Sequence, residues 1–225
     1  MKLVYEGKTK NVYLNPDGNY FLEFKDDVTG VGDEFDPGAN TVGPKILGNG
    51  KNCVLLTDYF FKKIEEAGIP THYISADTEN GTMVVKPAKL FGKGLEVVCR
   101  VKADGSFVRR YGDFCTKGQD LNYFVEVTLK DNDREDPPIS RDALDILGIL
   151  KKEEYDDIKD LTVKIVKIVE ALLAEKGIEL YDIKFEFGLI DGKVALVDEI
   201  SGGNMRAYKN GVIVKPTELP KEILG

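Results

Sequence analysis

Tyr181-Asp-Ile-Lys-Phe-Glu-Phe-Gly188 alternates strictly between charged side chains and aromatic or aliphatic ones. In an extended strand the two kinds point to opposite faces, because successive side chains alternate. One face then carries only charged groups: Asp182, Lys184 and Glu186. Beyond the turn residues Asp191-Gly192, a second run, Val194-Ala-Leu-Val197, is apolar at every position. The stretch therefore predicts a hairpin of two strands with at least one buried face.

The second strand runs into Leu196-Val-Asp-Glu-Ile-Ser-Gly-Gly-Asn-Met-Arg206, which begins with two adjacent acids and ends in an arginine. Carboxylates at the end of a buried hairpin are costly unless they bind a charged partner. A divalent metal ion that also contacts a polyphosphate would suit Glu186 and Asp198, since Mg²⁺ prefers carboxylate and phosphate oxygens. We predict these two residues as metal ligands.

The register of the hairpin decides whether the two carboxylates meet. A two-residue turn would pair Ile190 with Lys193 and turn Glu186 away from Asp198. A three-residue loop, with its glycine in the left-handed conformation of a bulge, would pair Leu189 with Lys193 instead. The two carboxylates share a face only in the second register, so we predict the three-residue loop.

Composition excludes several classes of protein. The chain has 225 residues, 42% hydrophobic and 31% charged, which is typical of a globular protein. Its net charge of −8 argues against a nucleic-acid binder, although a few local cations would suffice for a small anionic ligand. The sequence shows neither a membrane span nor a signal peptide, and its three cysteines are far apart. We therefore expect a cytoplasmic protein with reduced thiols and small-molecule partners. The single histidine, His72, is more typical of a structural role than of a catalytic base.

The pattern of elements predicts an α+β protein in two lobes, with antiparallel sheets and flanking helices. Residues 3–25 and the segments 82–86, 95–101 and 124–130 have the composition of strands. Helices are predicted over 52–67 and, from a buried stripe at three–four spacing, over 153–176. Residues 26–52 are rich in Gly, Asp, Asn and Pro, and we expect a functional or mobile loop there. The predicted lobes are residues 1–92 and 93–225.

Cationic residues occur at three places that could bind phosphate. Gly7-Lys8-Thr9-Lys10 is a short turn whose lysines could reach one anion, although a plain solvated hairpin has the same pattern. Lys86 ends an apolar strand, where a lysine either extends to water or contacts a nucleotide. The main basic cluster is Arg100, Ser106, Arg109 and Arg110, which favours an anionic ligand over surface salt bridges. Asp136, before two prolines, is held extended, so its carboxylate could be presented rigidly.

Together these motifs resemble the SAICAR synthetase family (phosphoribosylaminoimidazole-succinocarboxamide synthase), and they occur in the family's order over most of the chain. The matching stretches are Tyr5-Glu-Gly-Lys-Thr-Lys10, Phe24-Lys-Asp-Asp27, Gly68-Ile-Pro-Thr-His72, Glu96-Val-Val-Cys-Arg100, Gly105–Gly112, Asp136-Pro, Asp182–Gly188 and Asp198–Arg206. No single stretch is specific for the family, but the whole set of stretches is.

The resemblance implies an ATP-dependent ligase of purine biosynthesis with its ATP cleft between the lobes. In that reaction ATP phosphorylates the carboxylate of carboxyaminoimidazole ribonucleotide (CAIR), and the amine of L-aspartate displaces the phosphate. By motif, the residues implied for Mg²⁺–ATP are Lys8, Lys10, Lys86, Glu186 and Asp198. Those implied for the ribonucleotide are Arg100, Ser106, Arg110, Ser201 and Arg206. Lys184 and Asp136 are implied near the reacting carboxylate. A homodimer is the assembly to consider.

The chain departs from the family at Ser201-Gly202-Gly203, where relatives typically read Ser-Pro-Asp, so a substrate-facing aspartate is missing. Gly48-Asn49-Gly50 replaces the family's Gly-Lys-Gly, and the chain ends soon after Arg206. These departures keep two alternatives open: a paralogous amide ligase for another acid and amine, and a non-catalytic nucleotide-binding protein.

Overall fold

A computed structural model describes residues 1–32, 34–35 and 41–225. All of the strand pairings in this part of the chain are antiparallel, apart from one isolated bridge between Thr71 and Leu196. The predicted α+β class with antiparallel sheets and flanking helices is confirmed. None of the described helices is long and apolar enough to cross a bilayer.

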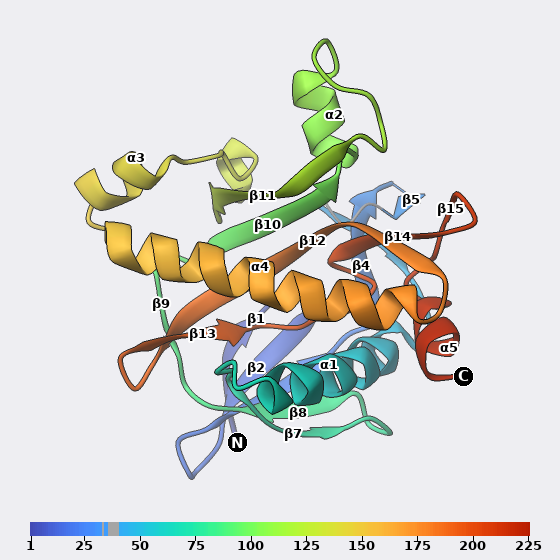
Figure 1. Ribbon diagram of the computed structural model, residues 1–225. Coiled ribbons are helices and arrows are strands. Elements are labelled where there is room, and N and C mark those ends of the chain that lie inside the picture. The colour runs from blue at the N-terminus through green and yellow to red at the C-terminus, as the bar shows by residue number, and fades with distance from the viewer. Residues whose placement is uncertain (33, 36–40) are drawn as a thin grey trace.

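The first sheet is built from the N-terminal part of the chain (Figure 1). Its five strands lie in the order β1 (Lys2–Glu6), β2 (Lys10–Leu14), β3 (Tyr20–Phe24), β8 (Thr82–Val85) and β7 (Tyr73–Asp77). The strands predicted within residues 3–25 and at 82–86 are confirmed. The turn Asn15–Asn19 between β2 and β3 is closed by a backbone hydrogen bond of 2.9 Å from Asn15 to Asn19.

The second sheet has seven strands and carries the hairpin formed by residues 181–197. Its order is β11 (Asp120–Leu129), β10 (Leu95–Lys102), β12 (Ile178–Ile190), β14 (Met205–Lys209) and β15 (Val212–Ile213). Two further strands, β13 (Lys193–Val197) and β9 (Lys89–Leu90), also pair with β12. Because β9 already belongs to this sheet, the chain leaves the first sheet between β8 and Lys89. The division into lobes at residue 92 stays a prediction.

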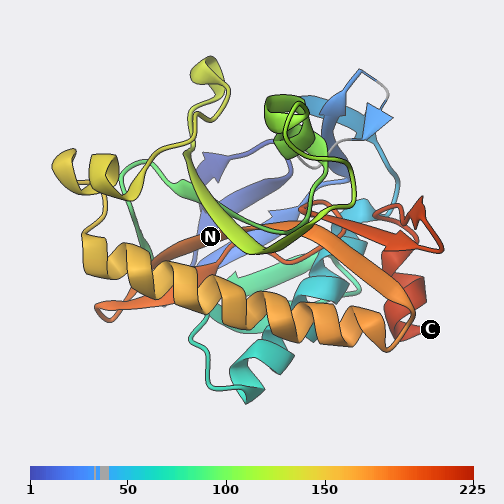
Figure 2. The same cartoon turned by 45° about the horizontal axis from the view of Figure 1, so that its top comes forward.

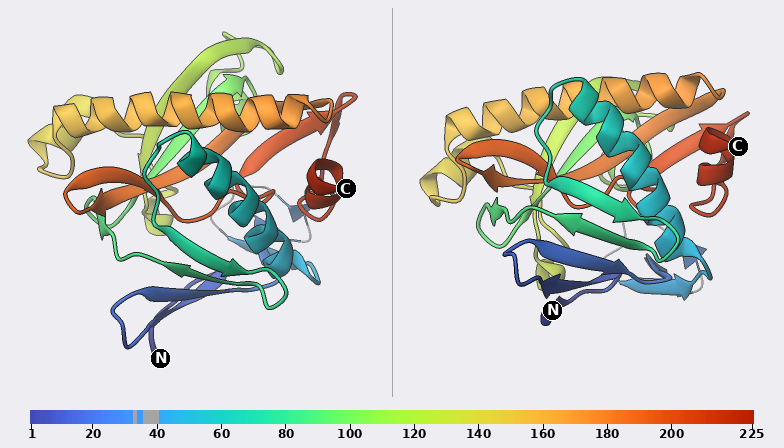
Figure 3. Two further views of the ribbon diagram at one scale, coloured as in Figure 1. Left: turned by 60° about the horizontal axis from the view of Figure 1, so that its bottom comes forward. Right: turned by 90° about the horizontal axis from the view of Figure 1, so that it is seen from below.

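Two long helices cover the sheets. Helix α4 (Lys152–Ala174) lies across the seven-stranded sheet (Figures 1 and 2). Helix α1 (Asn49–Glu66) lies along the five-stranded sheet and also contacts α4 (Figure 3). The fully buried side chains of α4 are Ile158, Thr162, Ile165, Val166, Val169 and Leu173. The predicted helix is therefore confirmed, but its buried stripe is rotated, since Leu161, Ile168 and Leu172 are only half-buried.

Shorter elements complete the chain. They are α2 (Gly105–Tyr111), the 3₁₀ turn Asn132–Arg134, α3 (Arg141–Ile146) and α5 (Leu219–Leu224). Helix α2 begins after Asp104, whose carboxylate accepts a hydrogen bond of 2.8 Å from the Gly105 backbone.

The segment 26–52 is more regular than its composition indicated. It contains β4 (Asp27–Val31), β5 (Glu34–Phe35), β6 (Val42–Lys45) and the start of α1, three residues earlier than predicted. A Cβ at Gly43 would lie 2.8 Å from the Cα of Gly30, so glycine here permits close strand contact rather than a loose loop. The part of this expectation that concerns residues 33 and 36–40 lies outside the described residues.

Candidate active site

A cleft of about 1060 Å³, partly open to solvent, lies between the two large sheets. The turn between β1 and β2 lines one side, and β12 with the loop after β13 lines the other. Seven of the predicted site residues line it: Lys8, Lys10, Asp136, Lys184, Glu186, Asp198 and Ser201. Residues far apart in sequence thus meet in one place, as the charged face of the hairpin predicts.

The predicted register of the hairpin is wrong. Ile190 pairs with Lys193, which leaves a two-residue turn, and Glu186 pairs with Val197. Asp191 and Gly192 have φ angles of 51° and 77°. Two successive left-handed residues match the right-handed twist of the flanking strands, and Asp tolerates this conformation better than most side chains. The Asp-Gly pair therefore selects the tighter turn.

Glu186 and Asp198 nevertheless face the same cleft. Strand β13 ends at Val197, and Asp198 has a φ of 70°, so the alternation of a regular strand stops just before it. Burial raises the pKa of Glu186, and the neighbouring charge of Asp198 raises it further. The two carboxylates are thus close enough to repel one another, although the strand register alone would separate them.

Lys10 contacts both acids after β13. Its ammonium group makes ion pairs with Asp198 and with Glu199. Burial alone would lower the pKa of Lys10, but the two carboxylates outweigh it and raise the pKa. Burial, and then the charge of Asp198, raises the pKa of Glu199 to about 7. For Asp198 the opposite holds, because Lys10 and Lys130 outweigh burial and lower its pKa.

The cleft also contains charged residues that are not predicted from the sequence as site residues, among them Lys130 and Glu96. Lys130, directly after β11, lies 2.5 Å from Glu186, and Glu96 of β10 lies 2.6 Å from Lys184. Burial disfavours the charged form of Lys184, but Glu96 raises its pKa. The signal for Glu96 was present, because it is an acid within the apolar run Leu95–Val98. Lys130 ends a strand beside polar loop residues, and nothing local distinguishes it from a solvated lysine.

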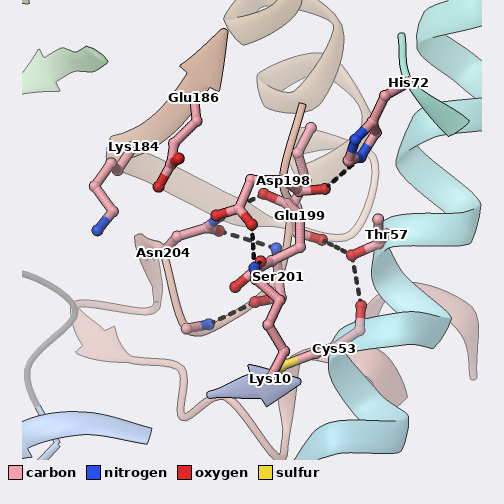
Figure 4. Close-up of polar contacts among 12 residues, drawn as sticks. Lys10, Cys53, Thr57, His72, Lys184, Glu186, Asp198, Glu199, Ser201 and Asn204 are labelled. Atoms are coloured by element: carbon pink, nitrogen blue, oxygen red, sulfur yellow. Dashed lines mark hydrogen bonds and ion pairs between the residues drawn. The ribbon is translucent and has the colours of Figure 1, made fainter. Parts of the chain in front are cut away.

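His72 has the structural role that the sequence favours. Its side chain is 5% exposed, and Nε2 lies 2.9 Å from the backbone carbonyl of Asp198 (Figure 4). Burial lowers the pKa of His72 to about 4, so the ring is neutral at pH 7. A carbonyl oxygen only accepts, so Nε2 carries the proton and donates.

The donor set fits Mg²⁺ rather than a metal held by protein alone. Among the described residues no group of three or more His, Cys, Asp or Glu side chains could hold a metal ion. Mg²⁺ commonly takes one or two carboxylates and completes its shell with phosphate oxygens and water. Glu186 and Asp198 supply such a pair, and Lys130 and Lys10 neutralise them in this structure.

The predicted basic cluster lies apart from the lining of the cleft and is paired with buried acids. Arg100 Nε lies 2.7 Å from Glu126, and its Nη1 lies 3.1 Å from Asp182. Arg206 also binds Asp182, at 2.9 Å, and Arg110 binds Glu126, at 2.5 Å. The alternative of salt bridges is therefore present. Arg100, Arg206 and the two acids are buried, whereas Arg109 and Arg110 are exposed.

Helix α2 begins against this cluster. The hydroxyl of Ser106 accepts a hydrogen bond of 2.8 Å from Arg100. A Cβ at Gly105 would lie 2.5 Å from the guanidinium carbon of Arg206, so only glycine allows the arginine to approach the helix start. A hydroxyl, two guanidinium groups and the first turn of a helix thus converge.

Other predictions hold less well. Asp136 lines the cleft, but its φ is 47°, so the extended conformation predicted for it is wrong. Lys86 is exposed and is absent from the residues that line the cleft. Gly203 does line it, beside Ser201. A Cβ at Gly202 would lie 2.6 Å from the Cα of Pro216, so that close approach explains why a larger residue is missing there.

Comparisons with known proteins agree with this geometry. The family model described as SAICAR synthetase matches residues 3–224. The phosphoribosylaminoimidazole-succinocarboxamide synthase of Clostridium tetani is 60% identical over 226 residues, which span all of both chains. A solved synthase of that name from Ehrlichia chaffeensis is 27% identical, with a TM-score of 0.84 over 100% of this chain and 92% of its own. A type-2 SAICAR synthetase in complex with ADP is 32% identical, with a TM-score of 0.81 over 92% of this chain and 84% of its own. The chain therefore belongs to the SAICAR synthetase family.

Proposed function

We propose that this cleft carries out the reaction of the family: ATP, CAIR and L-aspartate give SAICAR, ADP and phosphate. The chain is then an ATP-dependent ligase of purine biosynthesis. The observation that carries the proposal is the convergence of Lys10, Glu186 and Asp198 in one cleft of a chain 60% identical to a protein of that name. A relative in complex with ADP supports the nucleotide.

In this proposal the nucleotide phosphates lie against the turn between β1 and β2. Lys8 and Lys10 line that side of the cleft, and the exposed Lys86 is a further candidate contact. Glu186 and Asp198 would hold Mg²⁺, which neutralises phosphate charge when bound. Lys10 and Lys130 would then exchange carboxylate partners for phosphate oxygens.

The ribonucleotide phosphate is assigned to the start of α2. Arg100, Ser106 and Arg206 converge there, and guanidinium forks suit phosphate oxygens. Arg110 and Ser201 are the other residues proposed for this substrate. Asp182 holds both Arg100 and Arg206, so the two forks are already oriented before a ligand arrives.

Lys184 and Asp136 are proposed beside the reacting carboxylate, between the two phosphate sites. Burial raises the pKa of Asp136. In the first step a carboxylate oxygen of CAIR attacks the γ-phosphorus, and ADP leaves. The amine of L-aspartate then attacks the acyl carbon, the C–O bond to phosphate breaks, and the amine proton is released. Lys184 would stabilise the negative charge on the carboxylate and on the tetrahedral intermediate.

The decisive experiment is ADP release by the purified chain with ATP, Mg²⁺, CAIR and L-aspartate. We expect turnover that requires both CAIR and aspartate. Turnover that requires a different amine would indicate a paralogous ligase, and tight ATP binding without turnover on any acid would indicate a non-catalytic protein. Either result would overturn the proposal.

Two coarser expectations belong with this function. A cytoplasmic location suits an enzyme that uses ATP and carries free cysteines, Cys53, Cys99 and Cys115. The proposed assembly is a homodimer, which a measurement of molar mass in solution would test directly.

A further inference from the structure

The backbone that carries the two acids after β13 is held by buried side chains. The carbonyl oxygen of Asp198 accepts from His72 Nε2 at 2.9 Å, and that of Glu199 accepts from Asn204 Nδ2 at 2.6 Å. The carbonyl of Ile200 lies 3.2 Å from the hydroxyl of Thr57 (Figure 4). The peptide planes that follow Asp198 and Glu199 are therefore each fixed by a hydrogen bond, whereas the Ile200 carbonyl shares the single hydroxyl proton of Thr57 with the Cys53 carbonyl.

His72 differs from the other two donors in how it is itself held. Its backbone N–H donates to the carbonyl of Leu196 at 3.0 Å, and its own carbonyl accepts from Lys86 at 2.7 Å. Its ring lies 5.8 Å from that of Phe61 in α1. The imidazole thus projects from a fixed backbone, whereas Asn204 belongs to the same loop that it supports and the Thr57 hydroxyl also contacts Cys53 at 2.7 Å.

The hydrogen bond from His72 lies next to a residue whose backbone conformation is unfavourable. Asp198 is a non-glycine residue at a φ of 70°, a conformation that costs about 1 kcal/mol or more. If Asp198 relaxed to an extended conformation, its side chain would follow the alternation of β13, and Glu186, paired with Val197, would face away from it. A donor at the Asp198 carbonyl opposes that rotation, because it fixes the peptide plane that follows the residue.

We propose that His72 is a positioning residue for the metal–nucleotide site: it holds Asp198 in the left-handed conformation that brings its carboxylate to the side of Glu186. This inference rests on the proposed function of the cleft. It assigns His72 no contact with substrate and no proton transfer. Its effect is on the affinity gained through the metal, which needs both carboxylates, rather than on the affinity of the nucleotide itself.

The test compares ADP affinity with Mg²⁺ and with a chelator, by calorimetry, in the full chain. The variants are His72→Phe, which keeps a ring but no donor, and His72→Gln, whose amide nitrogen can reach the position of Nε2. The matched control is Thr162→Val in α4, a fully buried residue whose hydroxyl has no hydrogen-bond partner among the described residues.

We expect the increase in ADP affinity caused by Mg²⁺ to be about fivefold or more smaller in His72→Phe, as for one lost hydrogen bond. The ADP affinity measured with the chelator should stay within about twofold of the wild type. His72→Gln should recover most of that gain, and Thr162→Val should match the wild type. Hydrogen exchange of a peptide that covers residues 198–204 should be faster in His72→Phe than in His72→Gln.

Three results would overturn the inference. Mg²⁺ could raise the ADP affinity of His72→Phe as much as that of the wild type. His72→Phe could lose the same ADP affinity with Mg²⁺ and with the chelator, or His72→Gln could fail to recover the affinity that Mg²⁺ adds. If His72→Phe does not fold, His72→Asn takes its place, because its shorter amide does not reach the Asp198 carbonyl. Failure of the proposed function would look different, since the wild-type chain itself would then bind no ADP and release none from ATP.

Discussion

The Nζ atom of Lys130 lies 2.5 Å from Oε1 of Glu186, so a lysine already neutralises one of the two carboxylates that we propose as metal ligands. Glu186 is 7% exposed, and without a cation beside it both its burial and the charge of Asp198 would favour the protonated form. Lys130 and a metal ion therefore compete for the same oxygens, and each can replace the other as the counter-charge.

Substitution of Lys130 by methionine should lower stability most when no metal is present. The side chain of Lys130 is 43% exposed, so we discount the value for a buried pair and expect a loss of roughly 1–2 kcal/mol. Saturation with Mg²⁺ and ADP should remove most of the difference. Denaturant unfolding with and without these ligands measures this, with Lys152→Met as a control at an exposed ion pair. If Lys130→Met loses as much stability with Mg²⁺ and ADP as without them, Lys130 and the metal ion do not compete for Glu186.

Neutral versions of the carboxylates should separate catalysis from stability. Glu186→Gln and Asp198→Asn each remove one charge from a repelling pair while keeping the shape of the side chain. We expect kcat to fall by about 100-fold or more in both variants, as for loss of a charge-stabilising group in other active sites. The melting temperature should not fall in Glu186→Gln, but it should fall in Asp198→Asn, because Lys10 and Lys130 lower the pKa of Asp198 and so favour its charged form. Rates near those of the wild type in both variants would rule out the assigned metal role.

Arg206, which we propose as a contact of the ribonucleotide phosphate, also has a structural role, because it is buried against Asp182 at 2.9 Å. Arg206→Ala should raise KM for CAIR, since a phosphate contact far from the reacting atoms contributes mainly uniform binding. It should also cost roughly 2–4 kcal/mol of stability, because Asp182 then keeps Arg100 as its one ion-pair partner among the described residues. Steady-state kinetics and unfolding of the same preparation measure both. A rise in KM with unchanged stability would mean that Asp182 does not depend on this pair.

The sequence predicts the elements of the site better than its geometry. Strict alternation in residues 181–188 places Lys184 and Glu186 on one face, and the structure confirms it. The predicted register was wrong because it was inferred from the need to bring two carboxylates together, whereas Asp191-Gly192 itself favours a two-residue turn with both residues left-handed. The meeting of Glu186 with Asp198 depends in turn on a single φ angle after a strand end, which no periodicity reports.

Ion pairs between distant segments of the chain are also not predictable from the sequence. Glu96 and Lys130 complete the charge balance, but each is recognised only through a residue more than fifty positions away. The segment 26–52 was misjudged for a different reason. Glycines that allow close strand contact, as at Gly43, have the same composition as a loose loop.

The two-residue turn itself can be tested at Gly192. A Cβ there meets nothing within 4 Å, so Gly192→Ala should act only through the backbone, whose φ is 77°. We expect a loss of roughly 1 kcal/mol in denaturant unfolding, and little change for Asp191→Asn, because Asn adopts the left-handed conformation readily. Turnover should be unchanged, since the turn is four residue pairs from Glu186. If Gly192→Ala has the same free energy of unfolding as the wild type, the turn does not need glycine at its second left-handed position.

The pH dependence of stability should reveal the buried His72. Its pKa falls from 6.5 in the unfolded chain to about 4 in the folded protein. Between these values the unfolded chain binds the extra proton, so stability is highest above pH 6.5 and is lost as the pH falls towards 4. The shift corresponds to roughly 3 kcal/mol for a group this deeply buried. His72→Gln cannot titrate, and all other groups are shared by the two proteins. Unfolding at pH 7.5 and pH 4.5 should therefore show a steeper loss in the wild type, and parallel curves would mean that His72 titrates normally in the folded state.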